Sequence, residues 1–454
     1  MGFLFTLIYV SLALSSPADL IPSFAEYRVE VLIVIAALLF SAPSLLRSRF
    51  FEIPQVYLLA GLFAAVFLSQ AVTSHWIGGG VIALGRFLPG AIVFYLILLN
   101  CRTVGHLEML AFVLAVVAGV IVMEGAQAYL AKDINSQFVF VQGETGAEIM
   151  RIRGLGFLHD PNDLSQFLVM VIPLVWTMWR QARALRNILF VIAPTIFFIW
   201  GIYLTHSRGA ILALVVILLL AFKDRIGIIP AILGATIALS SFMAMDFAGG
   251  RAISVQAGSD RLALWSEGLQ LFKQSPLFGV GYLSFANQGR LGHTAHNSFV
   301  VCLAELGILG YSLWMGLVVF TFSGLNSLIA SLKAHQQIGP NVSDGELSNE
   351  GPMLQISAES REAAEKRGAD VDKWAKALRI SLAGFLAAAW FLSRAYVLTI
   401  YLVLGMAVAL LSFTSVEEEL VARQPVRQLV SLTAKFGFAA IAVVYVWVRV
   451  RSVL

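Results

Sequence analysis

The chain has 454 residues, of which 59% are hydrophobic and 13% charged, and a formal net charge of +4 at pH 7. Soluble domains usually carry about 25% charged residues, so this composition excludes an ordinary soluble domain. The basic residues are spread over many short loops and form no stripe, which argues against a nucleic-acid partner. Cys101 and Cys302 fall at a helix end and within a helix, and they predict neither a disulfide framework nor a metal cluster.

Apolar runs long enough to cross a hydrocarbon core of about 30 Å recur from end to end. The alternating segments of about ten residues that a transmembrane barrel requires do not occur. The sequence therefore predicts an all-α, polytopic helical membrane protein, with 1–454 as one transmembrane domain. The first run has no basic residue before it and no small-residue cleavage site after it, so we interpret it as a spanning helix and not a signal peptide. The candidate spans number about 12–13 and cover 2–16, 29–46, 54–74, 82–100, 107–128, 162–179, 187–204, 208–222, 226–244, 297–320, 378–393, 396–412 and 434–449.

Charge orients these spans in the membrane. If the N-terminus lies in the cytoplasm, the basic clusters of nearly every short loop fall on the cytoplasmic side, as the positive-inside rule requires. Two connections are long: 245–296 becomes a large periplasmic loop, and 331–377 becomes a cytoplasmic loop. The cytoplasmic loop begins with the string IGPNVSDGELSNEGP, which predicts a solvated linker. A charged stretch follows and predicts a helix.

The periplasmic loop contains one amphipathic segment. Leu262, Trp265, Leu269 and Phe272 recur at helical spacing, and a proline ends the pattern. With tryptophan on its apolar face, this short helix is expected to lie along the outer membrane interface. Arg261 would then sit beside the apolar face, near the lipid headgroups.

An arginine opens the span that follows LTHS. In LTHSRGAILAL, Arg208 occupies the first turn of a helix that starts at the outer face, with Ser207 as its expected cap. A helix N-terminus carries partial positive charge, so a cation is disfavoured there unless an anion shares the site.

A second helix with an outer start follows two arginines. In MRIRGLGFLHDPNDLSQFL, Asp160 fits the cap position, Pro161 the first helical position and Asp163 a capping-box position. Helix capping therefore explains the DPND core. It does not explain Arg151 and Arg153, which precede that core.

The stretch HTAHNSFVVCLAELGILG begins a third helix from the outer side. His296, Asn297 and Ser298 stand at its start, where free backbone N–H groups suit an anion. Arg86, in VIALGRFLPG, adds a cation near the outer end of another span. An ionisable residue inside a membrane span is by default a functional-site hypothesis.

Each of these features also has a simpler explanation, because arginines near helix ends can extend to lipid headgroups and histidines can cap helices. Together, several cations and helix starts at one membrane depth predict an electropositive pocket that faces outward. Its expected ligand is a headgroup with more than one negative charge, and the planar guanidinium suits phosphate. Besides Arg208, Arg261 and His296, the candidates for substrate binding are Arg86, Arg151, Arg153 and Asn297.

Glu305 lies nine residues after His296, about two and a half turns along the helix, and therefore faces the opposite side. We expect it to pair with a cation on a neighbouring helix. A zinc site formed by His293 and His296 lacks an evident third ligand. The sequence therefore predicts no metal and no cofactor.

Between about residues 150 and 320, the chain resembles the O-antigen ligase and O-antigen polymerase superfamily of bacterial envelope enzymes. The resemblance rests on the order of RGLGFLHDPNDLSQFL, LTHSRGAILAL, RLALWSEGLQLFKQSPLFGVGY and HNSFVVCLAELGILG. The N-terminal third resembles the family only as a hydrophobic pattern. The cytoplasmic loop and the thirteenth span depart from the twelve-span pattern that is commoner in the family.

The resemblance implies an inverting, metal-independent glycosyltransferase in the bacterial inner membrane, with its active site facing the periplasm. Such an enzyme moves a glycan from a polyprenyl pyrophosphate carrier to a sugar hydroxyl. Arg208 and Arg261 would hold the departing pyrophosphate, and His296 would orient the acceptor hydroxyl or take its proton. The implied partners are the lipid-linked glycan donor, a glycan or glycolipid acceptor, the bilayer and a chain-length regulator.

The acceptor distinguishes a ligase, which uses lipid A-core, from a polymerase, which uses another carrier-linked repeat unit. We lean towards a polymerase for a surface polysaccharide or exopolysaccharide. The alternative from another class is a transporter, either a polysaccharide exporter or a bicarbonate-type carrier. A transporter favours polar groups near the midplane and repeated halves, whereas this chain gathers its ionisable residues at outer helix ends.

Overall fold

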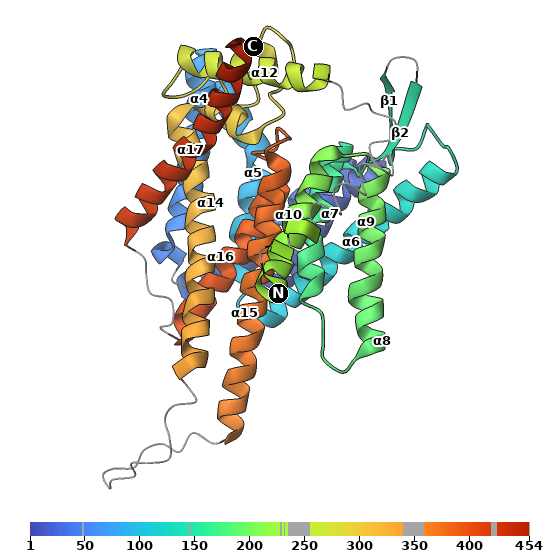
Figure 1. The fold of residues 1–454 in the computed structure, drawn as a ribbon, viewed down its shortest axis with the longest axis vertical. Helices are drawn as coiled ribbons and strands as arrows, with labels where there is room; N and C mark the ends of the chain where they lie inside the picture. The colour runs from blue at the N-terminus through green and yellow to red at the C-terminus, as the bar shows by residue number, and fades with distance from the viewer. Residues whose placement is uncertain are drawn as a thin grey trace.

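The computed structural model describes residues 1–47, 50–144, 147–227, 229–230, 232–234, 255–338, 358–418 and 425–453. Helices form nearly all of this structure (Figure 1). The helices are α1 (Gly2–Ser15), η1 (Pro17–Asp19), α2 (Pro22–Glu26), α3 (Val29–Arg47), η2 (Phe50–Glu52), α4 (Pro54–Ser74), α5 (Ile77–Asn100), α6 (Val104–Leu130), η3 (Gly156–Leu158), α7 (Pro161–Trp176), α8 (Ala184–Asn187), η4 (Ile188–Ile192), α9 (Ala193–Leu204), α10 (Arg208–Ile226), α12 (Val255–Gln274), α13 (Phe285–Gln288), α14 (Ser298–Ile338), α15 (Ala358–Ala389), α16 (Leu398–Glu418) and α17 (Val426–Val453).

The all-α, polytopic membrane class predicted from the sequence is confirmed. Within the described residues, six helical segments have the length and hydropathy to cross a membrane, and shorter apolar helices accompany them. The number of crossings remains a prediction. Most of the expected span 226–244 lies outside the described residues, as does the first part of the 245–296 loop.

The ends of the predicted cytoplasmic loop 331–377 are helical. Helix α14 continues to Ile338, and α15 begins at Ala358. The charged helix expected in the second half of this loop is therefore present. Residues 339–357, which include most of the predicted linker, lie outside the described residues.

A small antiparallel hairpin was not predicted from the sequence. Strands β1 (Val139–Glu144) and β2 (Ala147–Ile152) pair with Val139 opposite Ile152 and Phe140 opposite Arg151. The hairpin stands at the end of the bundle where α7 begins (Figure 1). As a result, Arg151 extends from strand β2 and not from an irregular segment before α7.

Helices α7, α10 and α15 pack against one another and frame the site. Close approach is possible because Gly384 of α15 lies against Ile217 of α10, where a Cβ would clash. Hydrogen bonds join α15 to α7: the Ser381 hydroxyl donates to the Met170 carbonyl at 2.6 Å. Small residues and interhelical hydrogen bonds of this kind commonly hold helices together inside a membrane.

Helix α14 is broken at Gly307, which has φ 63° and ψ −167°. The segment 276–281 of the outer loop pairs with the backbone freed at the break: Ile308 donates to the Pro276 carbonyl at 2.8 Å, and Val280 donates to the Ala304 carbonyl at 2.9 Å. Irregular backbone at membrane depth is tolerated only where protein or water satisfies its polar groups. The paired segment, which we call the outer-loop anchor (276–281), meets that requirement.

Glu305 lies beside this break. The prediction that it pairs with a cation is wrong for the residues that the structure describes. The carboxylate instead accepts the backbone N–H of Phe285 at 3.0 Å, while the Glu305 carbonyl accepts the Ser69 hydroxyl at 2.5 Å. Glu305 is 2% exposed. It therefore holds the outer loop against α14.

Candidate functional site

Three helices start at one end of the bundle. Helix α7 is capped by Asp160, whose carboxylate accepts the Asn162 N–H at 2.7 Å, and Pro161 occupies its first turn as predicted. Asn297 caps α14, where its side-chain carbonyl accepts the Phe299 N–H at 2.9 Å. Ser207 stands at the cap position of α10 but makes no side-chain cap hydrogen bond.

Arg394, in the short connection between α15 and α16, joins two of these helix starts. Its guanidinium pairs with Asp160 at 3.2 Å and with Asp163 of the same helix. Its backbone N–H donates to the Ser298 hydroxyl at 2.7 Å. The Ser298 hydroxyl in turn donates to the Leu392 carbonyl at 2.6 Å. Asp163 therefore serves as an ion-pair partner and not as a capping-box residue.

Sequence reasoning missed Arg394, although a signal existed. FLSRAY separates two apolar spans by only a few residues, and the predicted topology places it outside. A basic residue in so short an outer loop departs from the positive-inside rule. That departure could have identified Arg394.

Helix α12 brings Arg261 towards His296. The indole N–H of Trp265 donates to the Ala295 carbonyl at 2.9 Å. Arg261 lies four residues before Trp265 and thus on the same face of α12, and its guanidinium stands 5.9 Å from the ring centre of Phe391. Trp265 is buried, and α12 packs on α14 and α17. The interfacial position expected for this helix stays a prediction.

The electrostatic surroundings of His296 come from the same cluster. Partial burial lowers the pKa of His296, and the charges of Arg261, Arg394 and His293 lower it further, whereas Asp160 raises it. Its side chain remains accessible to solvent. The imidazole is therefore neutral at pH 7, with a free nitrogen able to take a proton.

His296 also has an unusual backbone conformation, with φ 48°. A residue other than glycine pays for this left-handed region in free energy. His206 has φ 49° and likewise stands just before the cap residue of its helix, α10. Two outer helix starts thus share a histidine in the same conformation, and the sharp turn directs each helix away from the loop that precedes it.

Arg208 is the first residue of α10. Its neighbour Gly209 packs on Phe391, whose Cβ lies 3.4 Å from the position that a Gly209 Cβ would occupy. Phe391 is therefore flanked by the start of α10 and by the Arg261 guanidinium. The connection 390–397, which also carries Arg394, thus lies beside the start of α10 and beside Arg261, and the charges of Arg261 and Arg394 both act on His296.

Arg151 is buried next to this cluster, with 3% of its surface exposed. It donates to the Thr205 carbonyl at 2.7 Å, to Gln142 at 3.1 Å and to Asn162 at 3.2 Å. These contacts tie the hairpin to the end of α9 and to the start of α7. Arg151 is therefore placed as a positioning residue and not as a direct phosphate ligand.

The other predicted binding residues lie differently. Arg153 donates to the Gln137 carbonyl at 2.8 Å and lies over the Phe140 ring at the edge of the hairpin. Arg86 is exposed on α5 and lines a separate cavity of about 220 Å³ beside Tyr282. Asn297 is fully buried and occupied with capping α14. Arg153 thus lies at the hairpin, whereas Asn297 adjoins His296, and the cavity of Arg86 borders Tyr282, whose ring packs on Tyr396 of the connection 390–397.

The fold is that of a polytopic helical membrane protein, with Arg261, Arg394 and the accessible His296 close together at one end of its bundle. Residues 193–315 match the family model described as O-Antigen ligase. A stretch of 103 residues is 33% identical to the exopolysaccharide production protein ExoQ of Rhizobium meliloti (strain 1021). That match covers 18% of this chain and 24% of the relative, so the chain spans about a quarter of the relative that it matches. The predicted resemblance to the O-antigen ligase and polymerase superfamily is confirmed.

Proposed function

We propose that the protein is a glycosyltransferase of the bacterial inner membrane that works at the periplasmic face. It moves a glycan from a polyprenyl pyrophosphate carrier to a sugar hydroxyl. The observation that supports the proposal is the arrangement around Phe391: the Arg261 guanidinium lies 5.9 Å from its ring centre, the start of α10 beside Arg208 packs on it, and the charge of Arg261 acts on His296. The family match covers all three residues.

In the proposed reaction, the acceptor oxygen attacks the anomeric carbon of the donor glycan. The bond from that carbon to the pyrophosphate oxygen breaks, and its electron pair leaves with the pyrophosphate. Arg208 and Arg261 stabilise the negative charge of the leaving group through their planar guanidinium groups. The single displacement inverts the anomeric centre.

His296 takes the proton of the attacking hydroxyl. Its lowered pKa keeps the imidazole neutral at pH 7, because burial and the neighbouring cations disfavour the imidazolium form. The pyrophosphate bound nearby supplies negative charge that helps the imidazolium to form during transfer. Proton transfer by a positioned side chain typically contributes about 10²–10⁴-fold to the rate.

Arg394 is already paired with Asp160 and Asp163. We assign it to the positioning of His296, since its backbone N–H holds Ser298 at the start of α14. Arg151 holds the start of α7 in the same way. Arg394 and Arg151 would therefore act indirectly, by holding His296 and the start of α7 in position.

The acceptor can be a second lipid-linked repeat unit or a core glycolipid. The name of the ExoQ relative favours exopolysaccharide, and the description of the family model favours ligation. We propose a polymerase for an exopolysaccharide, with the ligase as the second candidate.

Purified protein incubated with a polyprenyl-pyrophosphate glycan and each acceptor tests the proposal. A ladder of repeats indicates a polymerase, whereas one glycan joined to a core lipid indicates a ligase. Absence of product with both acceptors, from protein that remains folded and monodisperse, contradicts the transferase. It would favour the transporter alternative, which glycan uptake into proteoliposomes would then check.

A further inference from the structure

A large cavity lies at the far end of the same three helices. It has a volume of about 760 Å³ and is lined by the ends of α7 and α10 that are remote from Arg208 and by the charged part of α15. From the start of α7 to Trp176 is about 20 Å along the helix, at 1.5 Å per residue. This distal cavity is therefore separate from the proposed transfer site.

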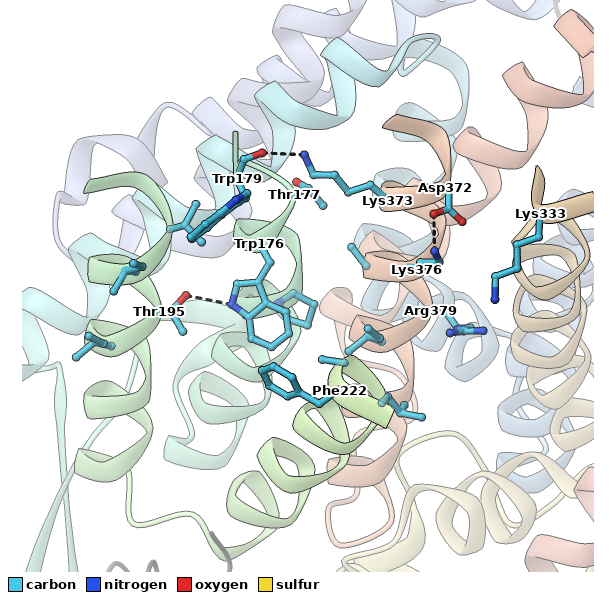
Figure 2. Close-up of a pocket in the computed structure, with 18 residues that line it drawn as sticks. Trp176, Thr177, Trp179, Thr195, Phe222, Lys333, Asp372, Lys373, Lys376 and Arg379 are labelled. Atoms are coloured by element: carbon cyan, nitrogen blue, oxygen red, sulfur yellow. Dashed lines mark hydrogen bonds and ion pairs between the residues drawn. The ribbon is translucent and has the colours of Figure 1, made fainter. Parts of the chain in front are cut away.

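Its wall has two chemically different sides (Figure 2). The indole of Trp176 and the ring of Phe222 lie on one side, and the basic side chains of Lys333, Lys376 and Arg379 lie on the other. Four basic residues line the cavity, the fourth being Lys373, against one carboxylate, that of Asp372.

The charge balance within the cavity favours an anion. Lys376 pairs with Asp372, so the single carboxylate of the wall is already committed. Burial lowers the pKa of Lys373 and the positive charge of Arg180 lowers it further, whereas Asp370 and Glu108, which do not line the cavity, raise it. The Lys373 ammonium donates to the Trp179 carbonyl at 3.2 Å, and the Arg379 guanidinium donates to the Asn326 side-chain carbonyl at 3.2 Å. Among the residues that line the cavity, four basic groups thus face one carboxylate.

The apolar side of the distal cavity continues into a second cavity. This cavity has a volume of about 680 Å³, lies between α6 and α9, and shares Ile196 with the first. Every residue that lines it is apolar, among them Phe112, Val116, Phe197 and Trp200. Ile196 is 63% exposed. A soluble anion would leave this apolar surface uncovered.

The wall of both cavities includes an irregular helical turn. Residues Ile188–Ile192 form the π-helical turn η4, and Ile192 lines the distal cavity while Leu189 lines the second. Single π-helical turns inside helices occur frequently at functional sites.

We propose that the distal cavity binds an anionic phospholipid. The phosphodiester lies against Lys333, Lys376 and Arg379, and the acyl chain passes Ile196 into the second cavity. Basic pockets between helices at the cytoplasmic side of a membrane are suited to acidic lipid headgroups. The basic loops around this end place it in the cytoplasmic leaflet by the positive-inside rule, so the site draws on lipid already present there.

The test uses the full chain purified in mild detergent. Affinity for short-chain phosphatidylglycerol is measured through the rise in thermal unfolding midpoint, with phosphatidylcholine and inorganic phosphate as the comparison ligands. The double variant Lys333→Gln, Arg379→Gln removes two cations from the cavity. The matched double variant Arg427→Gln, Lys435→Gln removes the same charge from α17, outside the cavity.

Phosphatidylglycerol is expected to bind more tightly than phosphatidylcholine to the wild type and to the α17 variant. The cavity variant should bind it about 25-fold more weakly, since each basic residue near an acidic lipid contributes about fivefold, or about 1 kcal/mol. Equal weakening in both variants, equal affinity for the two lipids, or equal protection by inorganic phosphate overturns the proposal.

A second variant tests the apolar part independently. Ala221 lines the distal cavity on α10, and Ala221→Trp fills the space beside Phe222. The variant should retain its helical circular dichroism and lose phosphatidylglycerol that copurifies with the wild type, as counted by native mass spectrometry. Retention of the same number of lipids by the folded variant contradicts the assignment.

Discussion

Basic residues lie near both ends of the group formed by α7, α10 and α15, but their surroundings differ between the two ends. At the end that holds the proposed transfer site (the transfer end), Arg394 pairs with Asp160 and Asp163, and Arg151 donates to three hydrogen-bond acceptors. At the distal end, four basic side chains share a cavity with one carboxylate. A count of basic residues therefore does not identify a binding surface. The positions of carboxylates and carbonyls decide which cations build the scaffold and which face a ligand.

The largest effect is expected at the transfer end from His296→Ala. Loss of the proton acceptor should lower glycan transfer by about 10²–10⁴-fold while the protein remains inserted. Because His296 has a left-handed backbone, His296→Asn is the matched variant: asparagine tolerates that conformation and lacks the imidazole. Transfer is measured by product formation from a lipid-linked glycan. Wild-type rates from either folded variant would remove His296 from the mechanism.

The second prediction concerns the scaffold. Asp163→Asn leaves Arg394 with Asp160 as its remaining carboxylate partner, and the loss of one hydrogen bond between charged groups costs about 2 kcal/mol. Lys333→Gln at the distal end should change the free energy of unfolding by less than about 0.5 kcal/mol, as surface substitutions usually do. Thermal unfolding in one detergent compares the two. Equal destabilisation would contradict the distinction between the two ends.

Arg208→Lys is expected to have an intermediate effect. An ammonium keeps the charge but cannot form two parallel hydrogen bonds with a phosphate group. The loss of one charge-assisted hydrogen bond, about 2 kcal/mol, corresponds to about 30-fold in the rate. The variant should unfold at the wild-type temperature and transfer glycan slowly. Full activity would shift the pyrophosphate assignment to another residue.

The smallest effect is a shift in pH dependence. Transfer needs neutral His296 and is therefore lost as the pH falls through the pKa of His296, which burial and then Arg261, Arg394 and His293 hold below its usual value. Replacing His293 by Gln removes one of these positive charges, so the pKa of His296 rises and the loss begins at a higher pH. The rate at the pH optimum should stay unchanged. An acid limb that moves the other way, or not at all, contradicts this electrostatic coupling.

The sequence predicted the parts of the site that depend on local rules. Capping residues mark where helices start, so the sequence placed DPND and His296 at helix starts. The helical spacing of apolar residues placed Arg261 on a helix. Arg394 was missed because its partners lie more than two hundred positions away, and local patterns do not report such pairings. The partners of Glu305 depend in the same way on residues far along the chain, whereas the hairpin is a local pairing of 139–144 with 147–152 that was not predicted.

The outer-loop anchor (276–281) has a consequence for substrate specificity. The chain enters the anchor from the helix that bears Arg261 and leaves it towards His296. The segments that lead to Arg261 and to His296 both start at the anchor, which is hydrogen-bonded to α14. Helix α14 therefore sets the spacing between the Arg261 guanidinium and the His296 imidazole. The exposed side chains of Asn287, Gln288 and Arg290 can therefore change, to suit a different sugar, while the backbone N–H groups of Arg290 and Leu291 stay bound to the buried Glu267 carboxylate.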